Sequence, residues 1–502
     1  MYKKIKNNGI IPIAEIPVLE YPAFADEVSH LLDSSACHCV NYYAVPFNNR
    51  LQYFCFIAND ETNDICILSH QTENSPEVKL ESLAKKHFAL HIFEREIHEN
   101  FGIQFDGHPW LKPVRYPFNR ADKNQVPDNY PFYRIESEEL HEVGVGPIHA
   151  GVIEPGHFRF ICDGEKVLHL EIHLGYQHRG VEQLFIKKNS TLQRCILAES
   201  IAGDSVIGHS MAYAGLMESL SGKQANDRLS IERVVAMELE RIAIHIGDTS
   251  ALSTDVAYQF GQVVNEALRT LVINTTQLWC GNRFGKGLIR PFGTHYPIDA
   301  MLADKMLATL KDVGERYLQI TDRIYNLTSV LDRFETVGEI TRKQAEKIGA
   351  VGMAARTTGL KRDIRHSHPF AGYHHIAYEP VLLTTGDVLA RGFLRKLEVE
   401  QSLDLVNKLL ERIKLIDIPS EKPIFDLKLQ PSQLGISLTE GWRGEICHSA
   451  VTNEQGEIIH YKVKDPSMHN WMALALAVRN QEISDFPICN KSFNLSYCGH
   501  DL

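Results

Sequence analysis

The sequence lacks the features that mark several large classes of protein. Its ten cysteines include no C-x-x-C pair and show no spacing typical of a disulfide framework. No run approaches the roughly 18 apolar residues that cross a bilayer, and the opening MYKKIKNNGI is not a secretory signal. Because 63 acidic residues outnumber 52 lysines and arginines, no general basic surface for nucleic acid is expected. We therefore expect a cytoplasmic protein that contacts a membrane only through other proteins.

The first part of the chain has an α+β pattern. Of the 502 residues, 44% are hydrophobic and 23% charged, a globular balance whose length suggests two to four domains. Short β-rich runs (YYAVPF, LQYFCFIA and DICILS) precede the amphipathic stretch VKLESLAKKHFALHIFEREIHENFG, which predicts a helix. A segment rich in Pro, Asn and Asp follows. We divide the chain into an α+β domain (1–120), a linker (121–144) and a second domain (145–502).

The second domain is predicted to be mainly helical, with small β elements at its entry and end. Strand-like runs come first, and the helical segments after them place apolar residues at i, i+3, i+4 and i+7. From Gly441 onward the pattern alternates as in a small hairpin. The helical segments are SIERVVAMELERIAIHIGDTSALS, MLADKMLATLKDVGERYLQITDRIYNLTSVLDRF and VLARGFLRKLEVEQSLDLVNKLLERIKL. The motif Cys37-His38-Cys39 is interpreted as part of a strand, because a metal site would need partners that the sequence does not offer.

Several motifs resemble a known family. FEREIHENFGIQFDGHPWLKPVRYP closely resembles the signature of the small hydrophilic subunit of respiratory complex I, with Glu99 in place of the usual aspartate. GPIHAGVIEPGHFRF is similar to the opening hairpin of the large subunit of energy-converting membrane hydrogenases. Further segments resemble the framework that these hydrogenases share with complex I: HLGYQHRGVEQLF, MELERIAIHIGD, GDVLARGFLRKLEVEQS, RGE and VKDPSMHNW. The chain thus resembles a fusion of the two subunits, which implies a hydrogenase-large-subunit-like second domain.

The resemblance places small residues where the hydrogenases bind nickel and iron. AESIAGDSVIGHS is similar to the family segment E-R-V-C-G-I-C-G-x-A-H-S, and its Ala202 and Ser205 fall on the two cysteines. In SFNLSYCGHDL the second pair of cysteine positions falls on Ser496 and Gly499, with Cys498 one residue out of register. A nickel–iron centre needs soft thiolate ligands. The resemblance therefore predicts no metal site and no hydrogenase activity.

The vacated space is the candidate binding site. In complex I the corresponding space holds a quinone headgroup, so the resemblance implies a cavity beside Asp204 and under Arg443, which matches the arginine above the hydrogenase metals. Desolvated Asp204 would have a raised pKa and exchange protons; alternatively it pairs with a buried arginine or caps a helix. His157 is the first candidate for the quinone-contacting histidine and His149 the second. The family's tyrosine contact has no counterpart beside Ala202.

Three further residues are proton-transfer or positioning candidates. His209 follows the ligand segment and is expected to orient the loop more than to carry protons. KRDIRHSHPFAGY resembles the segment that leads from the family's active cavity toward the membrane subunits. Within it, Asp363 and His366 are candidates for a proton relay, and we favour a relay or a structural role over metal binding.

Two functions stay open at this point. In the first, the chain is an oxidoreductase subunit whose emptied cavity binds quinone or another small oxidant. Its partners would be a small protein that carries an iron–sulfur cluster and antiporter-like membrane subunits. In the second, it is a non-redox structural or coupling subunit of an ion or inorganic-carbon transporter. In both, the expected place is the inner face of the cell membrane. The chain itself is expected to hold no cofactor, and it has no Gly-rich nicotinamide or flavin fingerprint.

Overall fold

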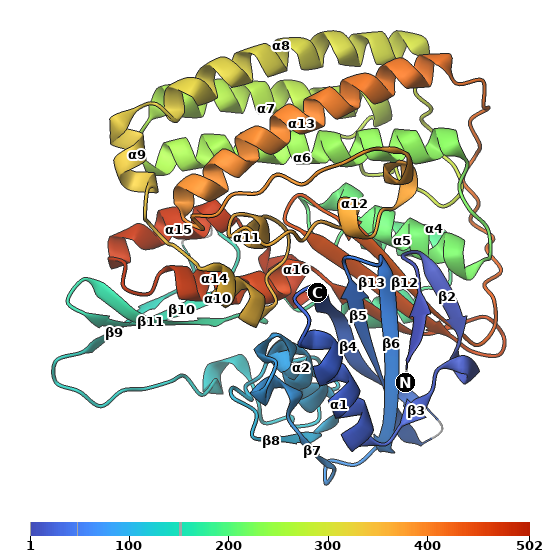
Figure 1. Ribbon diagram of the computed structural model, residues 1–502, viewed down its shortest axis with the longest axis vertical. Coiled ribbons are helices and arrows are strands. Elements are labelled where there is room, and N and C mark those ends of the chain that lie inside the picture. The colour runs from blue at the N-terminus through green and yellow to red at the C-terminus, as the bar shows by residue number, and fades with distance from the viewer. Residues whose placement is uncertain (1, 48, 150–152) are drawn as a thin grey trace.

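The N-terminal part of the chain is a mixed sheet covered by two helices. The computed structural model describes residues 2–47, 49–149 and 153–502. The elements of this part are β1 (Lys3–Ile5), β2 (Gly9–Pro12), β3 (Val18–Leu19), α1 (Tyr21–Leu32), β4 (Cys37–Phe47), β5 (Arg50–Asn59), β6 (Asp64–Glu73), β7 (Lys79–Glu81), α2 (His91–Phe101) and β8 (Gln104–Asp106). A five-stranded sheet runs in the order β1-β6-β5-β4, with β3 beside β6 (Figure 1). The three predicted β-rich runs lie in β4, β5 and β6, and the predicted α+β class is confirmed.

The predicted helix over residues 78–102 is wrong in its first half. Helix α2 begins only at His91, whereas β7 pairs in parallel with β8 and two 3₁₀ turns follow it. The side chain of Glu94 accepts hydrogen bonds from Ser82 Oγ (2.5 Å) and from Leu83 N (2.7 Å). The Leu83 N–H thus bonds to a side chain and not to a helical carbonyl oxygen, and the amphipathic stretch is divided between two local structures. Burial raises the pKa of Glu94 to about 7.

The charged residues of α2 hold the loop that follows it. Arg95 donates from Nε to the carbonyl oxygen of Lys112 (2.8 Å) and from Nη2 to that of Pro113 (2.7 Å). The Glu99 carboxylate accepts backbone N–H groups of residues 114–116, at 3.2, 3.0 and 2.8 Å. These side chains are buried, and buried charges in proteins are normally paired or hydrogen-bonded. The charged side chains of the signature FEREIHENFG thus hold residues 112–116 in place.

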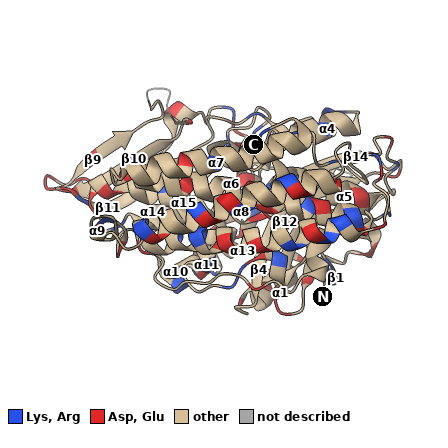
Figure 2. Cartoon of the chain, turned by 90° about the horizontal axis from the view of Figure 1, so that it is seen from above, with Lys and Arg blue, Asp and Glu red and all other residues tan. Residues whose placement is uncertain are grey.

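The second part of the chain is dominated by long helices. Helices α6, α7, α8 and α13 form a layer away from the N-terminal sheet (Figure 1), and charges of both signs are spread over its surface (Figure 2). The helices are α3 (Val181–Lys187), α4 (Thr191–Ala198), α5 (Val206–Leu220), α6 (Asp227–Asp255), α7 (Gln259–Cys280), α8 (Ala300–Ile324), α9 (Thr328–Phe334), α10 (Arg342–Ile348), α11 (Gly352–Arg356), α12 (Ile364–Ser367), α13 (Val388–Leu415), α14 (Ser467–Ala477), α15 (Phe486–Phe493) and α16 (Tyr497–Asp501). The three predicted helical segments lie within α6, α8–α9 and α13. No helix in the described part of the chain combines the length and apolarity that a membrane crossing requires.

Two antiparallel sheets complete the second part. The strands are β9 (His141–Val145), β10 (His157–Asp163), β11 (Lys166–His173), β12 (Gln433–Glu440), β13 (Glu445–Thr452) and β14 (Ile458–Lys464). One sheet has the order β11-β10-β9, so the predicted linker ends inside its edge strand β9. The other has the order β14-β13-β12-β2 and therefore includes a strand from the N-terminus. Ile11 pairs with Leu434 in this sheet.

The two parts of the chain share one core. Apolar residues of β4, β5 and β6 belong to the same buried cluster as residues of the long helices and of β12–β13. Polar contacts cross the same boundary: Tyr43 OH and Ser449 Oγ are 2.7 Å apart, and His38 Nε2 lies 2.7 Å from Glu445 Oε2. The Cys37-His38-Cys39 motif lies in β4 as predicted, but both faces of this strand are buried.

Candidate functional site

The segment AESIAGDSVIGHS runs from the last residue of α4 through a partly exposed turn into the first residues of α5. Ala202 and Ser205 are almost fully buried. A side chain at Gly208 would place its Cβ 2.8 Å from Ile446 Cδ1, so here the small residue allows close packing. Glu240 of α6 accepts hydrogen bonds from Ile207 N (2.7 Å) and Gly208 N (3.1 Å), which otherwise have no partner inside the first turn of α5. Burial raises the pKa of Glu240 to about 8.

Asp204 and Arg443 form a two-point ion pair. Arg443 donates from Nη1 to Asp204 Oδ1 and from Nη2 to Asp204 Oδ2, both at 2.6 Å. The arginine side chain is 4% exposed and that of the aspartate 35%. Burial opposes the charge of Arg443, but the Asp204 carboxylate outweighs it and raises the pKa of the guanidinium above its usual value. Of the alternatives considered for Asp204, the structure has the pairing with a buried arginine.

The four positions that the resemblance assigns to metal ligands carry no thiol. Ser205 Oγ accepts a 3.3 Å hydrogen bond from Arg443. Ser496 is the N-cap of α16, and its Oγ accepts from Gly499 N at 2.9 Å. Ala202 offers only a methyl group, and Gly499 has no side chain. This donor set of two hydroxyls does not fit a nickel–iron centre, which needs thiolates.

Gly499 has no room for a side chain. A Cβ there would lie 2.6 Å from Asp465 Oδ2 and 2.9 Å from Ser496 Oγ. We expect Gly499→Ala to lower the free energy of unfolding by about 1–3 kcal/mol, the usual cost of overpacking a core. Gly203→Ala is the matched control, because its Cβ would meet nothing within 4 Å. Chemical denaturation of both variants checks this, and equal unfolding midpoints would contradict it.

A chain of buried polar side chains starts behind Gly499. Asp465 Oδ2 lies 3.1 Å from His209 Nε2, His209 Nδ1 lies 3.1 Å from His448 Nε2, and His448 Nδ1 lies 2.7 Å from Tyr461 OH. One neutral tautomer of each histidine satisfies every bond, with each donor pointing toward the aspartate. Burial opposes ionisation of Asp465, but the hydrogen bond from His209 prevails and lowers the pKa of the carboxyl. His209 is therefore part of a continuous hydrogen-bond chain.

A cavity of about 800 Å³ opens beside the ion pair. Gly203, Asp204, Arg443, Ser496 and Cys498 line it, whereas Ala202, Ser205 and Gly499 do not. Such a volume is within the range of small-molecule sites, roughly 300–1,000 Å³.

The two candidate histidines of the entry hairpin are placed differently. His149 lines the cavity, and its Nε2 is 2.8 Å from the carbonyl oxygen of Gly156. His157 does not line it: Nδ1 is 3.0 Å from the Gly146 carbonyl oxygen and the ring lies against Phe132. Geometry thus reverses the order in which the sequence ranks these two residues.

Comparisons with known proteins agree with this architecture. Residues 255–501 match the family described as the 49 kDa subunit of respiratory-chain NADH dehydrogenase, and residues 18–123 match that of its 30 kDa subunit. The chain is a fusion of these two domain types. Its 49 kDa-type domain contributes Arg443, Ser496 and Gly499 from inside the matched residues, whereas Asp204 and His209 precede them.

Individual relatives come from hydrogenases and from NADH-quinone oxidoreductases. The chain is 28% identical over 366 residues to the alpha component of the membrane-bound hydrogenase of Pyrococcus furiosus, covering 70% of this chain and 85% of that protein. It is 24% identical over 472 residues to the C/D component of the NADH-quinone oxidoreductase of Phocaeicola vulgatus, covering 86% and 88%. A chain of the membrane-bound sulfane sulfur reductase, an archaeal respiratory membrane complex, has the same fold, with a TM-score of 0.65, 21% identity and coverage of 74% and 100%.

Asp363 lies in a separate ionic network of the 49 kDa-type domain. Its carboxylate accepts from Arg365 Nε (2.9 Å) and Nη2 (2.6 Å) and lies 3.3 Å from Arg356 Nη1. Arg356 also binds Glu398 (2.6 Å) and Glu440 (2.7 Å), and all five side chains are buried. Burial opposes ionisation of Asp363, but the two arginines lower the pKa of the carboxyl below its usual value. Asp363 is thus held as a fixed anion.

Glu440 is the titratable member of this network. Burial and the neighbouring Asp363 carboxylate raise the pKa of Glu440 to about 7. The other relay candidate, His366, lies outside the network: it is one-third exposed, and its Nδ1 is 3.0 Å from the Tyr378 carbonyl oxygen. In the ranges that the structure describes, no group of three or more His, Cys, Asp or Glu side chains has a geometry suited to a metal ion.

Sequence reasoning assigned no role to Asp465, His448 or Glu240. Asp465 lies inside the quoted motif VKDPSMHNW, and His448 follows the quoted RGE by only a few residues. Asp465 and His448 could therefore have been found as titratable residues in or near the matched framework motifs. The sequence evidence for Glu240 is weaker: it lies in the same motif, MELERIAIHIGD, as the buried Glu238.

Proposed function

We propose that this chain is a peripheral subunit of a membrane-bound energy-converting complex and works there in redox chemistry without hydrogenase activity. Its place would be the inner face of the cell membrane, where antiporter-like subunits and a small iron–sulfur subunit would be its partners. The relatives named above support the type of complex. The observation that carries the redox role is the 800 Å³ cavity with the Asp204–Arg443 pair on its wall.

The cavity suits a small oxidant with a polar head, of which a quinone is our first candidate. Arg443 is held by Asp204 and by the carbonyl oxygen of Asn494, to which its Nε donates at 2.5 Å. A cation fixed in this way is positioned to stabilise negative charge on a reduced oxygen. His149 lies at the same cavity and is a second hydrogen-bonding group there.

Reduction of a quinone to a quinol takes up two electrons and two protons. The electrons would come from the cluster of the small iron–sulfur partner. For the protons, the chain Asp465–His209–His448–Tyr461 ends directly behind the turn formed by Ser496 and Gly499. Ser496 also lines the cavity. We assign this hydrogen-bond chain the task of holding and delivering protons at that wall.

The substitution Asp204→Asn tests the redox role. It removes the counter-charge of Arg443 and alters the electrostatics of the cavity wall, so we expect electron transfer to a water-soluble quinone to fall by roughly 10²-fold. The pair is partly exposed, so the change in unfolding free energy should stay near 1 kcal/mol. The measurement is quinone reduction by the complex purified from native membranes. Asp404→Asn, which breaks the surface pair of Asp404 with Lys408, is the matched control.

The outcome separates the two candidate functions. A loss of electron transfer with normal co-purification of the partner proteins supports the redox proposal. Unchanged electron transfer and unchanged assembly would overturn it and leave the non-redox coupling role. The expected instability of Gly499→Ala is independent of this result, because it concerns the folded chain alone.

A further inference from the structure

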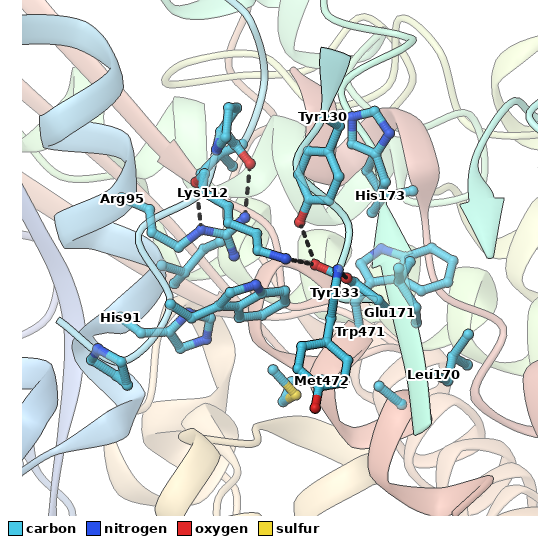
Figure 3. A pocket seen from close by; sticks show the side chains of 18 of the residues that line it. His91, Arg95, Lys112, Tyr130, Tyr133, Leu170, Glu171, His173, Trp471 and Met472 are labelled. Atoms are coloured by element: carbon cyan, nitrogen blue, oxygen red, sulfur yellow. Dashed lines mark hydrogen bonds and ion pairs between the residues drawn. The ribbon is translucent and has the colours of Figure 1, made fainter. Parts of the chain in front are cut away.

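A second cavity, of about 610 Å³, lies at the junction of the two domain types (Figure 3). Its walls come from α2, the 109–114 loop, Tyr130 and Tyr133 of the 121–144 segment, β11 and α14. It shares no lining residue with the cavity beside Asp204. The proposed redox reaction therefore does not use it.

Flat side chains form much of this wall. The ring of His91 stacks on Phe88, with centroids 4.4 Å apart, and on Trp110 at 5.5 Å. The Arg95 guanidinium lies 4.3 Å from the centroid of the Trp110 ring. Trp471 and the flexible thioether of Met472 complete the apolar side. Aromatic surfaces of this kind pack best against a flat partner.

Among the lining residues that the structure describes, both carboxylate oxygens of Glu171 already accept hydrogen bonds, whereas some N–H donors do not yet donate. Glu171 is already occupied by the Lys112 ammonium, by Tyr130 OH at 3.1 Å and by Tyr133 N at 2.7 Å (Figure 3). Arg95 donates from Nε and Nη2 to backbone carbonyl oxygens. Within the described residues, its Nη1 and the Trp110 indole N–H have no hydrogen-bond partner. An incoming ligand must therefore bring acceptors.

His91 also lines the cavity and adds no charge to it. His91 is 3% exposed, and its Nδ1 has no hydrogen-bond partner among the described residues. Burial keeps the pKa of His91 well below its usual value, so the ring is neutral and adds no charge. Arg95, Lys112 and, at the exposed rim, Arg479 then face the single carboxylate of Glu171. The excess of positive charge selects an anion and disfavours a cation.

We propose that this cavity is a binding site for a small aromatic acid, with one carboxylate or comparable anionic group on a flat apolar body. Arg95 and Lys112 would receive the acid group, and the rings of Trp110 and Trp471 with Met472 would receive the body. The volume fits a two-ring molecule, because ligand sites run from roughly 300 to 1,000 Å³. Trp471 Nε1 also lies 3.4 Å from the carbonyl oxygen of Ser496, so the site adjoins the wall of the first cavity.

Titration calorimetry of the full chain tests the proposal with three probes: 2-naphthoate, the neutral 2-naphthylmethanol and the aliphatic decanoate. A hydrogen bond to a charged group is stronger than one to a neutral group, so naphthoate should bind at least about tenfold more tightly than the alcohol. It should also bind more tightly than decanoate, because the walls are aromatic. Equal affinity of the acid and the alcohol, or tighter binding of decanoate, would overturn the proposal.

Substitutions then locate the binding. Met472→Trp fills the cavity from its partly exposed side and should abolish naphthoate binding, whereas Leu278→Trp on the exposed face of α7 should not. Circular dichroism and the melting temperature establish that each variant is folded. Arg479→Gln at the exposed rim is the second variant if Met472→Trp does not fold; it should weaken naphthoate and leave the alcohol unchanged. Naphthoate binding that neither substitution alters would contradict the assignment.

Discussion

Replacing Arg356 with methionine is expected to lower the free energy of unfolding by about 3–5 kcal/mol, the usual effect of removing one partner from a buried ionic group. The guanidinium contacts Asp363, Glu398 and Glu440, and none of these side chains is exposed to more than a trace. Without it, Arg365 is left to compensate Asp363, and Glu440 has no cation at ion-pairing distance among the described residues. Methionine fills similar space but supplies no charge.

Denaturant unfolding of the isolated chain measures this loss. Arg342→Met is the matched control, because Arg342 pairs with Glu346 at the surface of α10 with a separation of 2.9 Å. An exposed pair of this kind contributes about 0.3–0.5 kcal/mol. A loss below about 1 kcal/mol for Arg356→Met would mean that the buried acids take up protons or water without the penalty expected for an unpaired buried charge.

The substitution Glu440→Gln is expected to change how stability depends on pH. The pKa of Glu440 is raised from 4.5 to about 7 in the folded chain. A raised carboxyl pKa stabilises the fold fully below the unfolded value, and this contribution is lost as the pH rises through the folded value. Glutamine does not ionise. Relative to the wild type, Glu440→Gln should therefore gain about 3 kcal/mol between pH 5 and pH 8.

Unfolding of both proteins across this pH range checks the sign. Only the difference between them matters, because other carboxyls titrate in both; Glu445, for example, has its pKa lowered by Lys464 and His38 against the effect of burial. Glu346→Gln on the surface of α10 is the control and should follow the wild type. A pH-independent difference between Glu440→Gln and the wild type would show that Glu440 stays ionised throughout.

Local patterns predicted the elements of this fold better than the contacts between them. Short β-rich runs identify β4–β6, whose interior residues are buried on both faces, and helical periodicity identifies the long helices α6 and α13; both signals depend on residues close together in the sequence. The 78–102 stretch fails because periodicity alone cannot show that the Glu94 side chain occupies backbone donors near Leu83. Competition between side chain and backbone is decided by geometry.

The candidate site could be predicted only in part, again because contacts between distant residues are decided by the geometry of the fold. The resemblance brings Asp204, Arg443 and Ser496 to one cavity, and the structure places them there. It could not show that Asp465 meets His209 across 256 positions in the sequence. Nor could a lone acid such as Asp363 reveal the arginines that hold it. Pairings over such separations depend on the packing of the sheet against the helices.

The pairing of β2 with β12 also means that the N-terminal strand can fold only after most of the chain has been synthesised. Ile11 leaves the ribosome early, yet its partner Leu434 is made only near the end. At about 5–20 residues per second, the wait is roughly 20–85 s. During this time the N-terminal arm has no strand to join and is accessible to proteases and chaperones. Protection of residues 9–12 in arrested nascent chains would therefore appear only after β12 has emerged, and would mark the moment at which the two domain types become one folded unit.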